Sequence, residues 1–383
     1  MRNLRNVRFG HWTLGGSSDI TSACWDPNKD EVLCTLGPTA PSSSIQLVRL
    51  AERDSISHRT VARWDAPSPS PELPADRVVS IQYLGGTAST CIVFEGGDVV
   101  TVQEDQSPSD GGARIEIADV VVFMANSFDP LHEISLTPDD LRASKHVSVG
   151  WGKKETQFQG RGAKALRDPT ISEKVDQGIP SPHEYGATAI SWRGDGAYVA
   201  INSARQADRR VIRVYSRDGE LDSATEPVDG LEASLSWRPS GNLIAGIQRL
   251  QDRVDLVFFE RNGLRHGQFT LRCPENPAFP HSEVRLQWNS DSTVLAVAFE
   301  AAIQLWVMGN YHWYLKQEVP VGPGLPWLAW HPEKALRFIA AAPSSAVLTE
   351  HIFHTTRGTC WPPFDNGAVA VIDGQTVKLT SFR

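Results

Sequence analysis

A short pattern of apolar and polar positions recurs four times between residues 183 and 331. Each copy has two or three small or apolar positions ending in a tryptophan, followed by a polar cluster of Gly, Pro, Ser, Asp or similar residues. The tryptophans are Trp192, Trp237, Trp288 and Trp330, at intervals of 45, 51 and 42 residues. A period of about 40 to 50 residues is typical of propeller blades. The pattern therefore predicts a repeat protein.

Each copy also predicts a local structure. The apolar positions ending in tryptophan fill one buried strand, the polar cluster makes a hairpin turn, and the alternating apolar run that follows, such as residues 243–247, returns as the paired strand. A small sheet of this kind cannot bury both faces alone, whereas radial stacking against copies of itself gives a continuous core. We therefore expect an all-β, WD40-like β-propeller.

Counting these phrases predicts about seven blades, with the third incomplete. A fifth, less regular copy surrounds Trp25, whereas residues 113–142 have room for three strands but lack a Trp-turn phrase. We expect residues 1–10 to help close the ring and a hairpin about Asp373 and Gly374 to end the last blade. The expected single domain, 1–383, has blades near residues 1–65, 76–112, 113–142, 183–227, 228–280, 281–323 and 324–383, with an inserted basic loop at 145–182.

Composition narrows the class of protein. The chain has 383 residues, of which 40% are hydrophobic, and no window approaches eighteen consecutive apolar residues, so no membrane span is expected. The basic N-terminus leads into no apolar signal region. The five cysteines are spread singly, which argues against a disulfide framework. We expect a cytoplasmic protein, with the nucleus as a second location.

Four stretches outside the generic repeats carry a specific resemblance. They occur in the order HVSVGWGKKETQFQGRGAK (residues 146–164), FFERNGLRHGQF (258–269), NYHWYLKQE (310–318) and PFDNG (363–367). Together they resemble the largest subunit of the Elongator complex, the IKAP family. The resemblance covers nearly the whole chain, and it corresponds to the N-terminal WD-repeat propeller of that family.

The resemblance implies a non-catalytic scaffold in a complex that modifies the wobble uridine (U34) of tRNA. The implied partners are the other subunits, among them a WD-repeat subunit and a catalytic subunit with radical-SAM and acetyltransferase domains. The chain departs from the family in two respects. The second propeller and the helical region, where the family dimerises, are absent, so dimerisation of this fragment is not expected. The Trp-turn half of blade three is missing after residue 118.

The basic segment at 145–167 is the first candidate site. It holds six basic residues against one acidic residue, in a chain of net charge -8. Its glycines would let a phosphate approach, and its aromatic rings could stack on bases or pack on a partner. Docking to the catalytic subunit, direct tRNA contact, and a solvated or internally clamped loop remain alternatives. The candidate contact residues are Trp151, Lys153, Lys154, Phe158, Arg161, Lys164 and Arg167.

A run of aromatic residues at 310–315 is the second candidate site. Alternation along a strand would send some rings outward, where tyrosine and tryptophan typically anchor interfaces. Packing between neighbouring blades is the alternative. The candidate interface residues are Tyr311, Trp313 and Tyr314.

Catalytic and metal sites find no support in the pattern. His351 and His354 have the spacing of a ligand pair but lack a third ligand at a diagnostic interval. Neither a phosphate-binding GxxxxGK[ST] loop nor a GxSxG nucleophile elbow is present. We expect no enzyme, no cofactor and no metal. Direct tRNA binding and a generic protein-interaction propeller remain the alternative functions.

Overall fold

All regular elements in the described part of the chain are β-strands, which confirms the predicted all-β class. No helix in these residues is long and apolar enough to cross a membrane. The computed structural model describes residues 3–14, 19–39, 42–50, 58–67, 75–104, 109–114, 120–124, 130–136, 176–204, 209–272, 283–343, 345–356 and 368–381.

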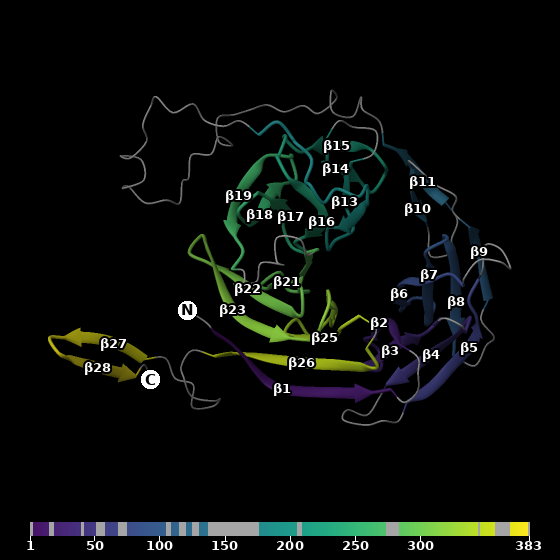
Figure 1. Ribbon diagram of the computed structural model, residues 1–383, viewed down its shortest axis with the longest axis horizontal. Coiled ribbons are helices and arrows are strands. Elements are labelled where there is room, and N and C mark those ends of the chain that lie inside the picture. Colours follow the sequence, from purple (N-terminus) through teal and green to yellow (C-terminus); the bar gives the residue numbers. More distant parts are fainter. Residues whose placement is uncertain are drawn as a thin grey trace.

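Six four-stranded antiparallel sheets form the blades of a propeller (Figure 1). Blade I consists of β2 (Ile20–Asp26), β3 (Glu31–Leu36), β4 (Ser44–Leu50) and β5 (Arg59–Asp65). Blade II consists of β6 (Val78–Leu84), β7 (Ser89–Phe94), β8 (Asp98–Gln103) and β9 (Ser109–Arg114). Blade III consists of β12 (Ala189–Trp192), β13 (Tyr198–Ser203), β14 (Val211–Ser216) and β15 (Leu221–Ala224). Blade IV consists of β16 (Leu231–Trp237), β17 (Leu243–Arg249), β18 (Val254–Glu260) and β19 (Arg265–Thr270). Blade V consists of β20 (Arg285–Trp288), β21 (Leu295–Phe299), β22 (Ala302–Gly309) and β23 (His312–Pro320). Blade VI consists of β24 (Trp327–Trp330), β25 (Arg337–Ala341), β26 (Val347–Thr356) and β1 (Asn3–Thr13).

The predicted strand-turn-strand unit is present in the repeated phrase. Trp192 ends β12 and Trp237 ends β16, and each is followed by the turn that leads to the paired strand. Those turns contain Gly196 at φ 67° and Gly241 at φ 98°, a backbone conformation that glycine adopts without a Cβ clash. The polar clusters in the sequence therefore mark the turns correctly.

The described residues form six four-stranded blades, where about seven were expected with the third incomplete. Between blades II and III the chain has only a two-stranded sheet, β10 (Val120–Met124) and β11 (Pro130–Ser135). This pair lies where blade three was expected. The strand β9 also runs to Arg114, past the expected boundary at residue 112, and joins blade II.

The N-terminal strand closes the ring, as predicted. β1 pairs antiparallel with β26, from Asn3 opposite Thr356 to Thr13 opposite Val347, and becomes the outer strand of blade VI. Gln317 Nε2 of blade V also donates to the carbonyl oxygen of Leu4 (2.8 Å). Two ends of the chain that are far apart in sequence are thus joined in one sheet.

The C-terminal hairpin is not part of the last blade, contrary to expectation. β27 (Ala368–Asp373) and β28 (Thr376–Ser381) pair with each other about the predicted Asp373-Gly374 turn, but with no blade. Figure 1 shows the hairpin outside the ring. The reason is that β1 already occupies the outer edge of blade VI.

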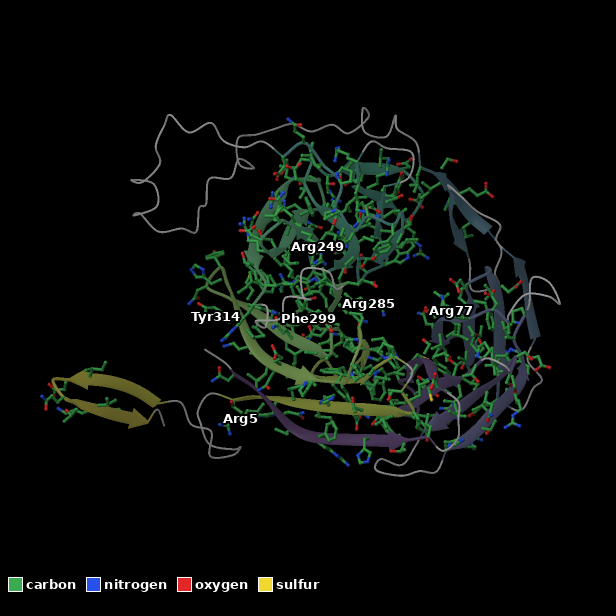
Figure 2. The ribbon with its side chains drawn as sticks, in the orientation of Figure 1. Arg5, Arg77, Arg249, Arg285, Phe299 and Tyr314 are labelled. Atoms are coloured by element: carbon green, nitrogen blue, oxygen red, sulfur yellow. The ribbon has the colours of Figure 1, made fainter. Side chains whose placement is uncertain are left out.

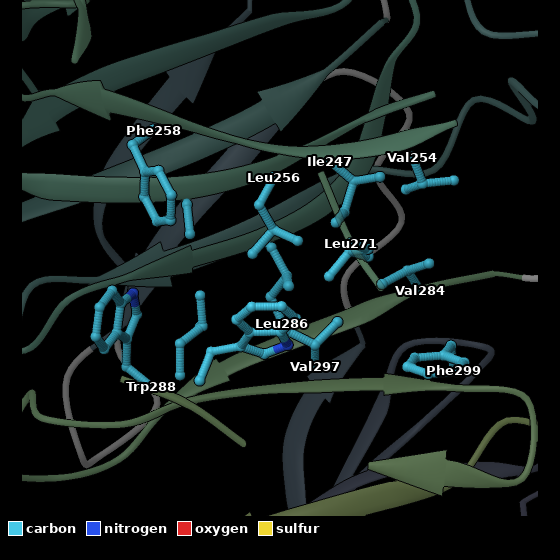
Figure 3. Close-up of a cluster of buried hydrophobic side chains, with 13 residues drawn as sticks. Ile247, Val254, Leu256, Phe258, Leu271, Val284, Leu286, Trp288, Val297 and Phe299 are labelled. Carbon is cyan, nitrogen blue, oxygen red and sulfur yellow. The ribbon is translucent and has the colours of Figure 1, made fainter. Parts of the chain in front are cut away.

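The hydrophobic core lies between neighbouring blades. Figure 3 shows one such layer, in which Leu256 and Phe258 of blade IV meet Leu286 and Trp288 of blade V. Neighbouring blades cover the inner strands, and all five residues of β21 are apolar and buried.

The repeated phrase also links one blade to the next. The residue immediately before each tryptophan accepts a hydrogen bond from the tryptophan of the following blade. The contacts are Trp237 N to Ser191 Oγ (2.8 Å), Trp288 N to Ser236 Oγ (3.1 Å), Trp330 Nε1 to Gln287 O (3.3 Å) and Trp25 Nε1 to Ala329 O (3.0 Å). The residues that mark the repeat in the sequence therefore also hydrogen-bond neighbouring blades to each other.

Candidate interaction surfaces

The basic segment lies outside the described residues, but its two flanks are described. On the N-terminal side, Ile134 and Leu136 are buried in the core cluster that contains Tyr215 of blade III. On the C-terminal side, the chain resumes at Asp176. The candidate residues Trp151, Lys153, Lys154, Phe158, Arg161, Lys164 and Arg167 all fall between these flanks.

A single carboxylate holds the start of the C-terminal flank. One oxygen of Asp229, a buried residue, accepts the backbone N–H groups of Gln177 (2.8 Å), Gly178 (2.8 Å) and Ile179 (3.0 Å). Asp176 itself pairs with Arg265 of blade IV (2.9 Å). The flank is therefore fixed to blade IV by charge and by backbone hydrogen bonds.

Two further ion pairs fasten the rest of this flank. Arg210 donates from Nε (2.6 Å) and Nη2 (2.5 Å) to Glu184, and Ser181 donates to Glu232 (3.0 Å), which also pairs with Arg249 (2.5 Å). Burial raises the pKa of Glu184, but the hydrogen bonds from Arg210 outweigh it, so the pKa lies below its ordinary value. Residues 176–184, which follow the basic segment, are thus attached to both blade III and blade IV.

Sequence reasoning missed this anchor. Asp229 and Arg265 lie 36 residues apart, in turn and strand positions that follow no shared period. The sequence carries no distinctive signal for it, because residues 176–188 contain only two acidic residues, Asp176 and Glu184, and no arginine. The contacts depend on residues 176–179 lying against Asp229 and Arg265 of blade IV.

The aromatic run lies on the hairpin that joins β22 to β23, and Figure 2 shows Tyr314 on this hairpin at the outside of the ring. Asn310 and Tyr311 form its two-residue turn, with φ values of 50° and 63°. Tyr311 is 70% exposed at the tip. A bulky residue in the left-handed region is unusual, because such turns favour glycine at this position.

The other two candidate aromatics are placed differently. Trp313 packs between blades IV and V, with its ring 4.7 Å from Phe258 and 5.2 Å from Phe269. It therefore fits the alternative of packing between blades. Tyr314 is half-buried, and Lys316 Nζ lies 5.3 Å from its ring centroid. Of the three residues, Tyr311 presents the most accessible ring.

The two histidines with ligand-like spacing do not converge. Both lie on β26, where His351 is buried and stacks on Phe338 (5.0 Å), whereas His354 is exposed. Residues three apart on a strand face opposite sides of the sheet. Within the described stretches, no group of three His, Cys, Asp or Glu side chains is arranged to hold a metal.

A cavity of about 240 Å³ lined by charged residues lies between blades I and II. On its wall the buried Arg49 pairs with Asp26 (2.6 Å) and Glu104 (2.9 Å), and Lys29 pairs with Glu104 (2.5 Å). The hydrogen bond from Lys29 is the largest cause that lowers the pKa of Glu104. Because opposite charges face each other here, the cluster acts as a joint between two blades.

The comparisons with known proteins agree with one another. The family model described as the ELP1 first N-terminal beta-propeller matches residues 1–119 and 115–333. The match is split at residues 115–119, which lie between β9 and β10. This is the place where the sequence analysis located the missing half of blade three.

Several curated relatives are similar along most of the chain. Elongator complex protein 1 of Schizosaccharomyces pombe is 37% identical over 99% of this chain, that of Saccharomyces cerevisiae 34% over 99%, and that of Mus musculus 33% over 82%. The two yeast alignments cover 32% of the relatives and the mouse alignment 26%, so the chain spans about a third or less of their length.

A solved structure shows the same fold at low identity. A chain in the crystal structure of the mitotic checkpoint complex aligns with a TM-score of 0.54 and 12% identity, covering 92% of this chain and 93% of that one. This likeness concerns the fold alone. The family match and the curated relatives together show that the chain belongs to the Elongator complex protein 1 family, as its N-terminal β-propeller.

Proposed function

We propose that the chain is a non-catalytic scaffold subunit of an Elongator-type complex. In this role it holds the catalytic radical-SAM and acetyltransferase subunit and so supports modification of the wobble uridine of tRNA. The observation that carries the proposal is the similarity along 99% of the chain to proteins named as subunits of that complex. A propeller suits this role, because a rigid ring presents fixed surfaces to several partners.

Two surfaces support docking to a partner. The basic segment is followed in the sequence by a flank, from Asp176 onward, that Asp229 and Arg210 fix to blades IV and III. Because one end of the basic segment is followed by a fixed flank, less conformational entropy is lost when the segment binds a partner. The second surface is the exposed ring of Tyr311, because exposed tyrosines commonly anchor interfaces.

The basic segment can be tested by charge reversal. The combined change Lys153→Glu, Lys154→Glu and Arg161→Glu is expected to reduce capture of the catalytic subunit by roughly tenfold or more, because it removes complementary charge. The matched control reverses three exposed cations elsewhere, Arg77, Arg285 and Lys378. Pull-down from cells lacking the native subunit measures capture.

The outcome separates the segment from the subunit as a whole. Loss in the first variant but not in the control supports docking through the basic segment. Equal capture by both variants and the unchanged chain removes the segment from the proposal. Failure of the unchanged chain to capture any Elongator subunit contradicts the scaffold role.

Direct tRNA binding is the second candidate function. The observation that favours it is the excess of five positive charges at 145–167 in an acidic chain. A phosphate-driven contact must weaken steeply as salt rises, because binding releases counterions. A gel shift with anticodon stem-loops across a salt series tests it, and binding that is absent or independent of salt would exclude it.

A further inference from the structure

The outer strand of blade VI has an edge that pairs with no other described strand. β1 is the last strand of its sheet, and Figure 1 shows it at the outside of the ring. Every blade has an outer strand, but β1 is the longest of the six, with 11 residues against 4 to 9 in the others. It therefore offers the longest edge for pairing with a further strand.

Three residues of β1 direct their main-chain groups toward this edge. Leu14 N donates to Ala346 O (2.9 Å), so these two residues form a hydrogen-bonded pair at the end of the ladder between β1 and β26. Hydrogen-bonded and non-hydrogen-bonded pairs alternate along an antiparallel ladder. Phe9, His11 and Thr13 therefore turn their N–H and C=O groups away from β26.

A bulge limits the length of the regular edge. The register with β26 shifts between Asn6 and Arg8, so Val7 has no register partner in β26. Bulges interrupt strand pairing. From Arg8 to Thr13 the register is regular, which leaves six residues for pairing with a further strand.

The side chains along this edge combine positive charge with an apolar ring. Arg8 is exposed and forms no ion pair with any described residue, and Phe9 is 55% exposed. β1 also contains Arg5 and has no acidic residue. The one acid of β26, Glu350, is fully buried and pairs with Arg337 (2.5 Å). These two strands therefore present positive charge at their surface.

The charge decides which kind of strand fits. A second copy of β1 would bring two positively charged edges together, and charged side chains on an edge discourage such pairing. An added strand would place Arg8 in a non-hydrogen-bonded pair, where facing side chains come closest. An acidic side chain opposite Arg8 and an apolar one beside Phe9 would complement the edge.

We propose that β1 from Arg8 to Thr13 is a docking site for an extended acidic segment of a partner protein, which adds to blade VI as a fifth strand. Main-chain hydrogen bonds to Phe9, His11 and Thr13 provide affinity, and Arg8 selects a segment with a carboxylate opposite it. The site lies on a different blade from the flank of the basic segment, which is attached to blades III and IV. It does not depend on the proposed function.

Peptide binding tests the charge. Two short synthetic peptides are compared by fluorescence anisotropy, one in which Glu alternates with Val and Thr, and one with Lys in place of each Glu. The acidic peptide is expected to bind the chain roughly tenfold more tightly than the basic one. Arg8→Glu is expected to reverse this preference. Arg63→Glu, an exposed arginine on the outer strand of blade I, is the matched control and should keep it.

A proline tests the main-chain pairing. His11→Pro removes an N–H that points away from β26, so it should abolish binding of the acidic peptide and leave the blade folded. His11→Ala keeps the N–H and should bind as the unchanged chain does. Circular dichroism checks that each variant is folded.

Hydrogen exchange locates the bound peptide. The acidic peptide is expected to slow exchange of the amides of residues 9, 11 and 13, also in the variant with Lys153, Lys154 and Arg161 reversed. Slowed exchange only at other residues would overturn the site. Equal binding of both peptides, unchanged binding by Arg8→Glu or His11→Pro, or no binding up to about 1 mM peptide would overturn it as well.

Discussion

At the scale of single residues, the most informative position is Tyr311. Its φ of 63° places a large side chain in a conformation that glycine adopts far more easily. Strained positions of this kind persist where the surrounding structure or a function maintains them. Because the ring is 70% exposed, burial within the chain does not explain the choice. The proposed contact with a partner would explain it.

Relief of this strain should stabilise the protein. Tyr311→Gly is expected to raise the free energy of unfolding by about 0.5 kcal/mol. The reason is that the left-handed conformation costs other residues roughly 1 to 2 kcal/mol, which exceeds the added flexibility of an unfolded glycine. Urea unfolding measures the change. The reverse substitution at another turn, Gly263→Tyr at φ 84°, should lower stability. A loss of stability in Tyr311→Gly would contradict the strain.

At the scale of elements, the pairing of β1 with β26 closes the ring. A buried histidine lies at this joint, where Asn6 Nδ2 of β1 donates to His351 Nδ1 (3.2 Å) and His351 Nε2 lies 3.2 Å from Thr349 Oγ1. These contacts require the neutral imidazole, in which Nδ1 accepts. Burial lowers the pKa of His351 to about 4.

Acid should therefore weaken this joint. The unfolded chain binds a proton at His351 near its ordinary pKa of about 6.5 and the folded chain only near 4, so stability is lost as pH falls between these values. We expect a loss of about 2 kcal/mol between neutral pH and pH ~5. Urea unfolding at both pH values measures it. His351→Gln does not titrate, so its loss should be smaller, and an equal loss would show that other groups are responsible.

At the scale of the whole molecule, the position of a repeat in the ring decides what its residues contribute. Trp237 and Trp192 occupy the same place in similar phrases, yet Trp237 is 2% exposed in a cluster with residues of blade III, whereas Trp192 is 43% exposed. The same sequence pattern therefore contributes different amounts to folding stability at different places in the ring.

Substitution of these two tryptophans tests the difference. Trp237→Ala is expected to lower the free energy of unfolding by about 3 to 5 kcal/mol, as for a large side chain removed from a packed core. Trp192→Ala is expected to cost about 1 kcal/mol or less, because its side chain is 43% exposed. Chemical denaturation followed by circular dichroism measures both. Equal costs would show that the exposed fraction of the two side chains does not set their contributions to stability.

Much of the architecture was predictable, because it depends on neighbours in sequence. Apolar alternation and polar turn clusters specify hairpins locally, so the all-β class, the Trp phrases, the incomplete third unit and the closing N-terminal strand were all anticipated. The basic segment was found from charge alone and lies outside the described residues. The aromatic run was found too, but its pattern does not show which ring faces solvent.

The features that the sequence pattern did not predict all depend on contacts between segments that are distant in the sequence. Trp313 faces Phe258 because two blades stack, and Asp229 receives the flank of the basic segment because blade IV lies beneath it. The last blade takes β1 rather than β27 and β28, since both compete for one edge. Hydrogen bonding along a strand is set by a few adjacent residues, whereas burial depends on whether another part of the chain arrives to cover a surface.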